Sequence, residues 1–422
     1  MSTQASQGST PYQLDGSGSD IHGEAAALRE LGPAVRVHLP GEIPAWSVTD
    51  PGLIRRLLAH KEVSKDAHQH WPAYQEGRVP EDWPLRIWVD VRNALAAFGS
   101  EHTRLRRPLA SAFTARRVRA LEPQIQEITD KLLDELEADA ETGAVDLRDQ
   151  FAWRLPLLVV NALLGVPEEL HDDFRDAIGT LFATDLSPEE AAAGGVETYR
   201  LLNELIEIKS QTPADDVTSA VIAAHAEGDL DDQELRDSLL LLIGAGHETT
   251  VNLIDHAIAN LLLHPEQRER ATSGEVPWEA VIEETLRHQA PIASIILRFA
   301  VRDLTDEETG VTFARGDAIV INYAAAGRDP GVHGETADEF DVGRAAAREH
   351  LAFGYGVHYC VGAPLARLEG RIALETLFTR HPDLALAVDA DQLTPLPSLI
   401  SNGHQKLPVK LDGAAAGQGQ AA

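Results

Sequence analysis

Residues 353–362 read FGYGVHYCVG and include the only cysteine of the chain, Cys360. Two glycines precede this cysteine and one follows it, so the main chain can adopt angles closed to other residues and let a flat ligand approach. A helical pattern follows over residues 363–377. Cys360 is therefore expected near a helix N-terminus, where the dipole and free N–H groups lower the pKa of a thiol. A thiolate ligand is one interpretation, and a buried, inert cysteine is the other.

A second stretch predicts one long helix over residues 232–263. Asp231 and Glu234 form a capping-box pattern at its start, and Pro265 lies just beyond its end, where a helix would stop. At 1.5 Å per residue such a helix is about 48 Å long. Its middle is apolar on nearly all faces, which predicts a buried helix that crosses the domain.

The middle of this helix reads AGHETT over residues 245–250. Glycine in a buried helix costs about 1 kcal/mol relative to alanine, and threonine can hydrogen-bond back to a carbonyl and bend the helix. The pattern indicates room for a small ligand and a route for protons through Glu248 and Thr249. A core helix with a packing glycine is the alternative, although a buried, unpartnered Glu248 would be costly there.

Two further patterns are weak when each is taken alone. Glu284 and Arg287 are three residues apart and face one side of a predicted helix, which usually means a surface ion pair. His102 and Arg106 are four residues apart and could together bind a carboxylate. A solvated basic face is the alternative for that second pair.

In this order and with these spacings, the four motifs resemble the cytochrome P450 family, in its soluble bacterial form. The match is F-G-x-G-x-H-x-C-x-G in residues 353–362, and the resemblance covers about residues 20–411. It implies a mainly α fold: a large helical domain with small β-sheets and a long central helix that crosses the haem. It also implies haem b as cofactor, with Cys360 as the thiolate ligand of the iron.

The resemblance further implies a role for each motif. Glu248 and Thr249 would be the catalytic acid–alcohol pair of oxygen activation. The positions that contact haem would be His102, Arg106, Ala245, Gly246, Arg298, Phe353, Gly354, His358, Cys360 and Gly362. Fold support behind the haem would come from Glu284, Arg287 and Arg344. An apolar substrate pocket is expected at Trp71, Trp83, Trp88, Leu242, Ile292, Ile295, Ile296 and Ile400. The three tryptophans could instead be core packing or loop anchors.

Composition excludes several classes of protein. Acidic residues exceed basic ones, 67 to 36, which gives a formal net charge of -31. Such a field repels nucleic acid and anionic membranes, so neither is expected as a partner. A single cysteine excludes an internal disulfide and favours a reducing cytoplasm. No signal peptide and no apolar run of about 20 residues is present, so we expect a cytoplasmic protein.

The chain has no long linker and no repeat, so residues 20–411 are predicted to form a single domain. Residues 1–19 and 412–422 are predicted to be flexible tails, because their ends consist mostly of small and polar residues. Further helices are expected at residues 116–140, 149–164 and 196–208. Strands are expected at residues 35–39, 45–48, 295–300, 311–313 and 318–321.

No dinucleotide-binding fingerprint is present, so electrons must come from separate proteins. The resemblance implies a ferredoxin and an NAD(P)H-dependent ferredoxin reductase. A basic face for the ferredoxin could be formed by Arg104, Arg107, Arg116, Arg117 and Arg367. Each of these arginines could equally be paired with a nearby acid.

The leading hypothesis is a monooxygenase that uses O2 to hydroxylate or epoxidise an apolar natural product. Oxidative coupling of aromatic or cyclic-peptide substrates, without insertion of oxygen, is an alternative. A haem-based sensor or binding protein is an alternative of another class. It would need the haem but not Glu248 and Thr249.

Overall fold

The computed structural model describes residues 11–140, 143–182 and 188–412. The predicted tails therefore lie largely outside the described residues. Residues 11–19, assigned to a tail from composition, have a defined structure. Strand β1 (Tyr12–Gln13) pairs in parallel with Val37 and His38, and the Asp15 carboxylate accepts backbone N–H bonds from two serines. Pairing with a sheet edge gives this segment the partners that its composition did not indicate.

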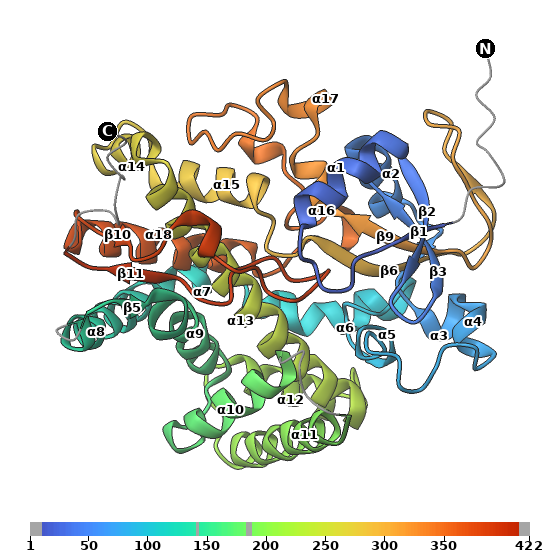
Figure 1. The fold of residues 1–422 in the computed structure, drawn as a ribbon. Helices are drawn as coiled ribbons and strands as arrows, with labels where there is room; N and C mark the ends of the chain where they lie inside the picture. The colour runs from blue at the N-terminus through green and yellow to red at the C-terminus, as the bar shows by residue number, and fades with distance from the viewer. Residues whose placement is uncertain (1–10, 141–142, 183–187, 413–422) are drawn as a thin grey trace.

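Helices form most of the described chain (Figure 1). In chain order the α-helices are α1 (Ile21–Leu31), α2 (Pro51–Ala59), α3 (Ala67–His70), α4 (Pro72–Gln75), α5 (Ile87–Asp90), α6 (Gly99–Ala112), α7 (Ala115–Ala120), α8 (Glu122–Ala140), α9 (Arg154–Leu164), α10 (His171–Phe182), α11 (Pro188–Gln211), α12 (Val217–Ala226), α13 (Asp232–Leu263), α14 (Pro265–Thr272), α15 (Trp278–His288), α16 (Tyr323–Gly327), α17 (Pro330–His333) and α18 (Ala363–Arg380). Shorter helical turns are η1 (Arg148–Ala152), η2 (Glu168–Leu170), η3 (Ala347–Glu349), η4 (Gly356–His358) and η5 (Ala390–Gln392).

The strands are short, as the sequence predicts. They are β1, β2 (Ala34–Leu39), β3 (Ile43–Val48), β4 (Val63–Ser64), β5 (Val145–Asp146), β6 (Ser294–Ala300), β7 (Leu304–Thr305), β8 (Thr312–Phe313), β9 (Ala318–Asn322), β10 (Ala385–Leu386) and β11 (Pro408–Lys410). Among the described residues they form a sheet of order β1-β2-β3-β9-β6-β4 and two smaller sheets. The predicted hairpin of β2 and β3 is antiparallel, with Leu39 opposite Ile43.

Helix α13 is the centre of the fold and has the bounds that its caps predict. The Asp231 side chain accepts a hydrogen bond from the backbone N–H of Glu234. The Glu234 carboxylate in turn accepts one from the backbone N–H of Asp231. In Figure 1, α13 lies between helices α8 to α12 and the large sheet. Apolar side chains of α13 enter the core cluster with α8, α15 and α18 and also the one with α11 and α12. The buried position predicted for this helix is confirmed.

Two expected helices are interrupted near prolines. Residues 116–140 form α7 and α8 with a break at Leu121, because Pro123 has no N–H for the preceding turn. Residues 149–164 begin as the π-helix η1. Pro156 cannot donate to the carbonyl four residues before it, and the Trp153 N–H bonds to the Arg148 carbonyl at 2.8 Å.

Within the described ranges, none of the helices combines the length and the apolar character needed to span a bilayer.

Candidate functional site

The loop that carries Cys360 lies between η4 and the first turn of α18. Gly354 and Gly356 have φ angles of 72° and 71°, where other residues are strained. A Cβ atom on Gly356 would lie 2.6 Å from the Leu58 carbonyl oxygen, so no side chain fits there. The Cys360 N–H donates to the Phe353 carbonyl at 2.9 Å, which closes the loop. These constraints fix the position of the sulfur.

The pKa of Cys360 is shifted in the opposite direction to the one expected from the sequence. Burial raises the pKa of the Cys360 thiol above its usual value. The backbone N–H groups of Gly362 and Ala363 act in the predicted opposite direction but do not outweigh the burial. Direct coordination to a metal ion would keep the thiol deprotonated whatever its free pKa.

The middle of α13 is open on one side. Ala245 is exposed and Thr249 is half-buried, whereas the adjacent residues His247 and Glu248 are buried. The Thr249 hydroxyl donates to the Ala245 carbonyl at 2.7 Å, as the sequence predicts. The helix therefore presents a hydroxyl and small side chains where its neighbours are covered.

Close packing against helix α9 explains why residue 246 is a glycine. A Cβ atom at this position would lie 3.2 Å from Cγ2 of Val160 in α9, closer than most real Cβ contacts. The packing alternative that the sequence left open therefore applies to Gly246. It does not apply to Ala245, whose side chain is exposed.

Glu248 has a buried partner that the sequence did not indicate. Its carboxylate lies 3.3 Å from the guanidinium of Arg148 in η1, and both side chains are less than one-tenth exposed. Burial raises the pKa of Glu248, and Arg148 opposes the rise without cancelling it. Burial thus favours the protonated form of Glu248, in reach of the open stretch of α13.

A cluster of basic side chains forms a second part of the site, in addition to the open stretch of α13. The rings of His102 and His358 lie 4.1 Å apart. Burial, together with the charges of Arg106 and Arg298, lowers the pKa of His102 to about 4. Burial and the charges of Arg298, His102, Lys65 and Arg106 likewise lower the pKa of His358. His102, Arg106, Arg298 and His358, all predicted to contact haem, are therefore brought together.

Lys65 is a member of this cluster that sequence reasoning missed. Its side chain is buried, and its ammonium donates to the Ile296 carbonyl of β6 at 3.2 Å. Burial and then the charge of Arg298 lower its pKa well below the usual value. A lone lysine before a short helix carries no signal in the sequence, because its partners come from distant elements.

The basic cluster fits an anionic ligand. Among the described residues, no carboxylate forms an ion pair with any of the five side chains. The Nε atom of Arg298 and the Nε2 atom of His102 are buried without a hydrogen-bond partner. Buried charges need compensation, and two propionate carboxylates would supply it. The cluster, the thiol of Cys360 and the open stretch of α13 together fit haem b.

The expected structural triad has the predicted geometry. Glu284 and Arg287 are fully buried and share two hydrogen bonds of 2.7 and 2.8 Å. Arg344 lies 3.3 Å from the same carboxylate. Arg287 also donates to the carbonyls of Gly327 and Ala337. The triad thus ties α15 to the loops that precede Cys360.

A second ion pair supports the cysteine loop directly. Glu283 binds His350 at 3.0 Å and Arg367 at 2.5 Å. The guanidinium of Arg367 lies 4.6 Å from the centre of the Phe353 ring. Phe353, which was predicted to contact haem, is therefore held in place by α15 and α18.

The predicted substrate-pocket residues divide into two groups. Trp71 stacks on Phe299 with ring centres 5.2 Å apart and meets Trp83 edge-on at 5.9 Å. The Trp83 indole donates to the Pro40 carbonyl at 2.8 Å. Both tryptophans belong to the buried core beside the large sheet, and Trp88 packs against it. Their positions support the packing alternative.

The aliphatic pocket residues are buried or half-buried near the same elements. Ile296 and Ile400 lie in the core cluster of the large sheet, with Ile292 against it, and Leu242 lies in the cluster of α13 with α11 and α12. Ile295 packs against a neighbouring cluster. Their role toward a substrate stays a prediction.

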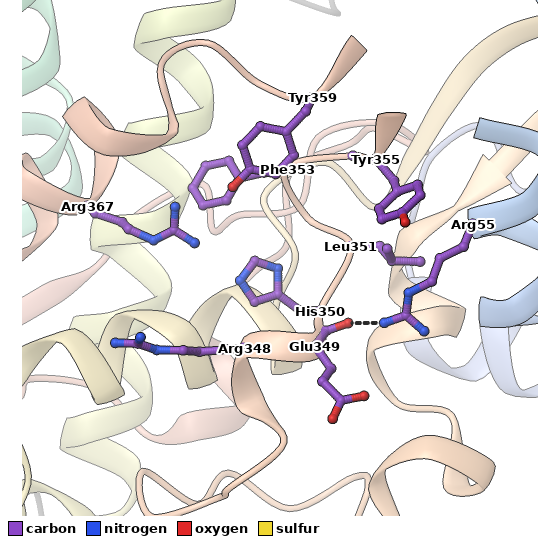
Figure 2. A pocket seen from close by; sticks show the side chains of 10 residues that line it. Arg55, Arg348, Glu349, His350, Leu351, Phe353, Tyr355, Tyr359 and Arg367 are labelled. Carbon is purple, nitrogen blue, oxygen red and sulfur yellow. Dashed lines mark hydrogen bonds between the residues drawn. The ribbon is translucent and has the colours of Figure 1, made fainter. Parts of the chain in front are cut away.

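A surface pocket of about 200 Å³ lies on the cysteine side of the molecule (Figure 2). Arg55, Arg348 and Tyr355 border it, and Arg55 donates to the Glu349 carbonyl at 2.6 Å. Beside it, the cysteine loop exposes Tyr355 and Tyr359, whose side chains are 46% and 41% exposed. The pocket is thus bordered by arginine and aromatic groups, with the exposed Glu349 beside them.

Most of the arginines proposed for a basic face are paired with acids. The ion pairs are Arg104 with Glu234, Arg107 with Asp229, Arg117 with Asp215, and Arg367 with Glu283. Arg116 is exposed. The paired alternative therefore holds for four of the five, because the many acids of this chain neutralise them.

Comparisons with known proteins agree with this geometry. The family model described as Cytochrome P450 matches residues 278–385. The chain is 42% identical over 407 residues to a 2-hydroxy-5-methyl-1-naphthoate 7-hydroxylase of Streptomyces carzinostaticus, covering 96% of this chain and 98% of that protein. It is 37% identical to a vitamin D(3) 25-hydroxylase of Pseudonocardia autotrophica, covering 92% and 93%. The structure of CYP154A1 from Streptomyces coelicolor is similar with a TM-score of 0.88 and 49% identity, covering 95% of this chain and 100% of that one.

Proposed function

The chain belongs to the cytochrome P450 family, and on that premise we propose that it hydroxylates a rigid, mainly apolar ring compound among natural products. Relatives named for hydroxylation of a naphthoate and of vitamin D(3) support this substrate class. The apolar side chains near α13 and β6 support a pocket of matching character.

We assign a role to the residues of the cysteine loop, the basic cluster and the open stretch of α13. Cys360 would bind the haem iron, and Lys65, His102, Arg106, Arg298 and His358 would hold the propionates. When bound, the haem supplies the redox chemistry that activates O2. The small, exposed side chain of Ala245 would leave space beside the haem.

One observation carries the proposal of hydroxylation. Thr249 faces the open stretch of α13, and the next residue toward the N-terminus is the buried acid Glu248. The raised pKa of Glu248, caused by burial, suits a group that takes up and releases protons. The Thr249 hydroxyl gives its hydrogen to Ala245, so its oxygen can still accept a bond. A binding protein would have no use for this pair.

The test is a reconstitution with a ferredoxin, a ferredoxin reductase and NAD(P)H, using naphthoic acids and sterols as candidate substrates. Candidates are first selected by the change that they cause in the haem absorption spectrum. Turnover under oxygen-18 gas should then give products that carry one labelled atom. A coupled product without label would overturn hydroxylation in favour of oxidative coupling. Binding without substrate-dependent NAD(P)H consumption would favour a sensor.

We infer that the ferredoxin docks on the surface formed by Tyr355, Val357 and Tyr359 with Arg55 and Arg348. The three loop side chains are exposed, and Arg348 is exposed beside them. A local positive group attracts an acidic partner, even on a chain with a net charge of -31.

The Arg348→Glu variant tests this docking surface. It should slow reduction of the haem by ferredoxin and leave reduction by dithionite unchanged. The Arg175→Glu variant, altered on the exposed surface of α10, is the matched control. Equal rates with ferredoxin for wild type and Arg348→Glu would overturn the docking surface.

A further inference from the structure

One face of α13 carries three polar side chains at helical spacing. Glu248, Asn252 and Asp255 follow one another at intervals of four and three residues, so they point to the same side. All three are buried. Arg148 approaches this face from η1, and His404 approaches it from the segment that precedes β11.

The contacts join these side chains into one chain. Arg148 lies 3.3 Å from Glu248 and 3.5 Å from Asp255, so one guanidinium serves two carboxylates. It also donates to the Asn252 side-chain carbonyl at 3.0 Å. His404 then binds the Asp255 carboxylate twice, through Nδ1 at 2.9 Å and through its backbone N–H at 3.0 Å.

The charges in this group do not balance without a further proton. One guanidinium and two ionised carboxylates leave a net charge of -1 in a buried place, which is costly. Burial would raise the pKa of Asp255, but His404 and Arg148 outweigh the effect and lower it. Asp255 therefore stays ionised. Glu248, whose pKa burial raises, is the carboxyl group of the two that can carry the balancing proton.

Other titratable groups nearby do not take this proton. The His256 ring packs on the His404 ring at 4.8 Å, and burial lowers the pKa of His256 to about 3. His247 lies beside Glu248 in sequence, but its Nε2 meets the Trp153 carbonyl, and burial lowers its pKa to about 4. Both are neutral near neutral pH. Glu248 and His404 are thus linked through Arg148 and Asp255, with Asn252 beside them.

We propose that Asp255 and His404 are positioning residues that set the protonation state of Glu248 through Arg148. The two bonds from His404 stabilise the Asp255 carboxylate and leave Arg148 free to pair with an ionised Glu248. When the bonding from His404 is weakened, Asp255 competes more strongly for Arg148, and Glu248 holds its proton more tightly. The His404 side chain is 15% exposed and that of Asp255 is not exposed, so His404 is the end of the group nearer to solvent.

This arrangement predicts opposite effects for two variants. His404→Gln replaces the 2.9 Å imidazole bond to Asp255 with a weaker amide donor, so Asp255 should draw more on Arg148 and Glu248 should stay protonated to higher pH. Asp255→Asn removes the competing carboxylate, so Arg148 should hold Glu248 ionised to lower pH. If the two residues had a purely structural role, both variants would loosen the site, and the titration midpoint of Glu248 would not shift in opposite directions.

The experiment is an infrared pH titration of the resting, haem-loaded protein. The carboxylic-acid C=O band of Glu248 is assigned by its loss in Glu248→Gln. Its midpoint should rise by about one pH unit or more in His404→Gln and fall by about as much in Asp255→Asn. His225→Gln, which removes a surface histidine 2.8 Å from Asp232, is the matched control and should leave the midpoint unchanged.

An unchanged midpoint in His404→Gln, or shifts of the same sign in both variants, would overturn the proposal. His404→Gln alone decides the matter if Asp255→Asn does not fold, because the sign of its shift is specific. The inference rests on the proposed function in one respect, that the proton of Glu248 is used in hydroxylation. The titration needs no substrate and no turnover, so a failure of coupling and a failure of the proposed reaction are distinguishable.

Discussion

Lys65 and Arg298 are buried beside the same strand, β6, and repel each other. The Lys65 ammonium donates to the Ile296 carbonyl, two residues before Arg298 along that strand. Burial and the charge of Arg298 lower the pKa of Lys65, and burial lowers that of Arg298. Two like charges are tolerated inside a protein only where an anion compensates them. This pair therefore indicates where the propionates of the haem would lie.

The Lys65→Met variant tests this interpretation. We expect it to lose haem about 10-fold faster or more, because a hydrogen bond to a charged group contributes about 1.5–3 kcal/mol. The rate of haem transfer to apomyoglobin measures the effect. Lys61→Met, at an exposed position four residues earlier, should not change the rate. A Lys65→Met variant that retains haem as well as wild type would show that Lys65 does not hold the cofactor.

The Glu284→Gln variant should be strongly destabilised. The carboxylate of Glu284 is fully buried between Arg287 and Arg344, and its loss leaves two guanidinium groups without an anion. Breaking one partner of such a group costs about 3–5 kcal/mol. The free energy of unfolding in urea measures it.

Glu279→Gln is the matched control, on the same helix. Glu279 is 47% exposed and lies 3.8 Å from Arg371, so its loss should cost about 0–1 kcal/mol. Equal stabilities of the two variants would contradict a supporting role for the triad.

The features that the sequence predicts well are those with local signals. The bounds of α13 follow from a capping box at Asp231 and a proline at Pro265, both within one turn of the helix ends. The loop of Cys360 is equally local, because its glycines and the start of α18 are contiguous. The break at Leu121 was not predicted, because a single proline, Pro123, interrupts an otherwise regular apolar stripe.

The features that the sequence missed depend on contacts between distant segments. Lys65 and Arg148 are single basic residues without a pattern, and their partners lie more than 90 residues away. For Trp71 and Trp83 the sequence left substrate contact and core packing open, and only the ring contacts of the folded chain favour packing. The pKa of Cys360 was expected to fall because of the helix N-terminus, whereas the burial that reverses the balance is a property of the folded chain.

Glu283 should contribute to stability in a pH-dependent way. Burial alone would raise its pKa, but the bonds from His350 and Arg367 outweigh burial and lower the pKa from 4.5 to about 2. A lowered folded-state pKa stabilises the protein fully above about pH 4.5, and this contribution is lost as the pH falls toward 2.

The Glu283→Gln variant should therefore be less stable than wild type near neutral pH, by up to about 3 kcal/mol. The difference should shrink as the pH is lowered through this window. Urea unfolding at a series of pH values measures it, with Glu375→Gln on the surface of α18 as the control. A difference that stays constant across the window would mean that the charge of Glu283 is not responsible.

The Thr249→Val variant should separate proton delivery from substrate binding. Thr249 and Thr250 make the same type of bond, to the carbonyl four residues earlier, at 2.7 and 3.0 Å. Only Thr249 faces the open stretch of α13, since Thr250 is buried. We expect product formed per NAD(P)H consumed to fall about 100-fold in Thr249→Val, which is the lower end of the range for losing one group of a proton-transfer path. The substrate-induced spectral change should persist. Thr250→Val should leave the yield of product near that of wild type, because its hydroxyl has no access to the site. If both variants lose yield equally, bending of α13 by its threonines is responsible, and the hydroxyl of Thr249 has no part in moving protons.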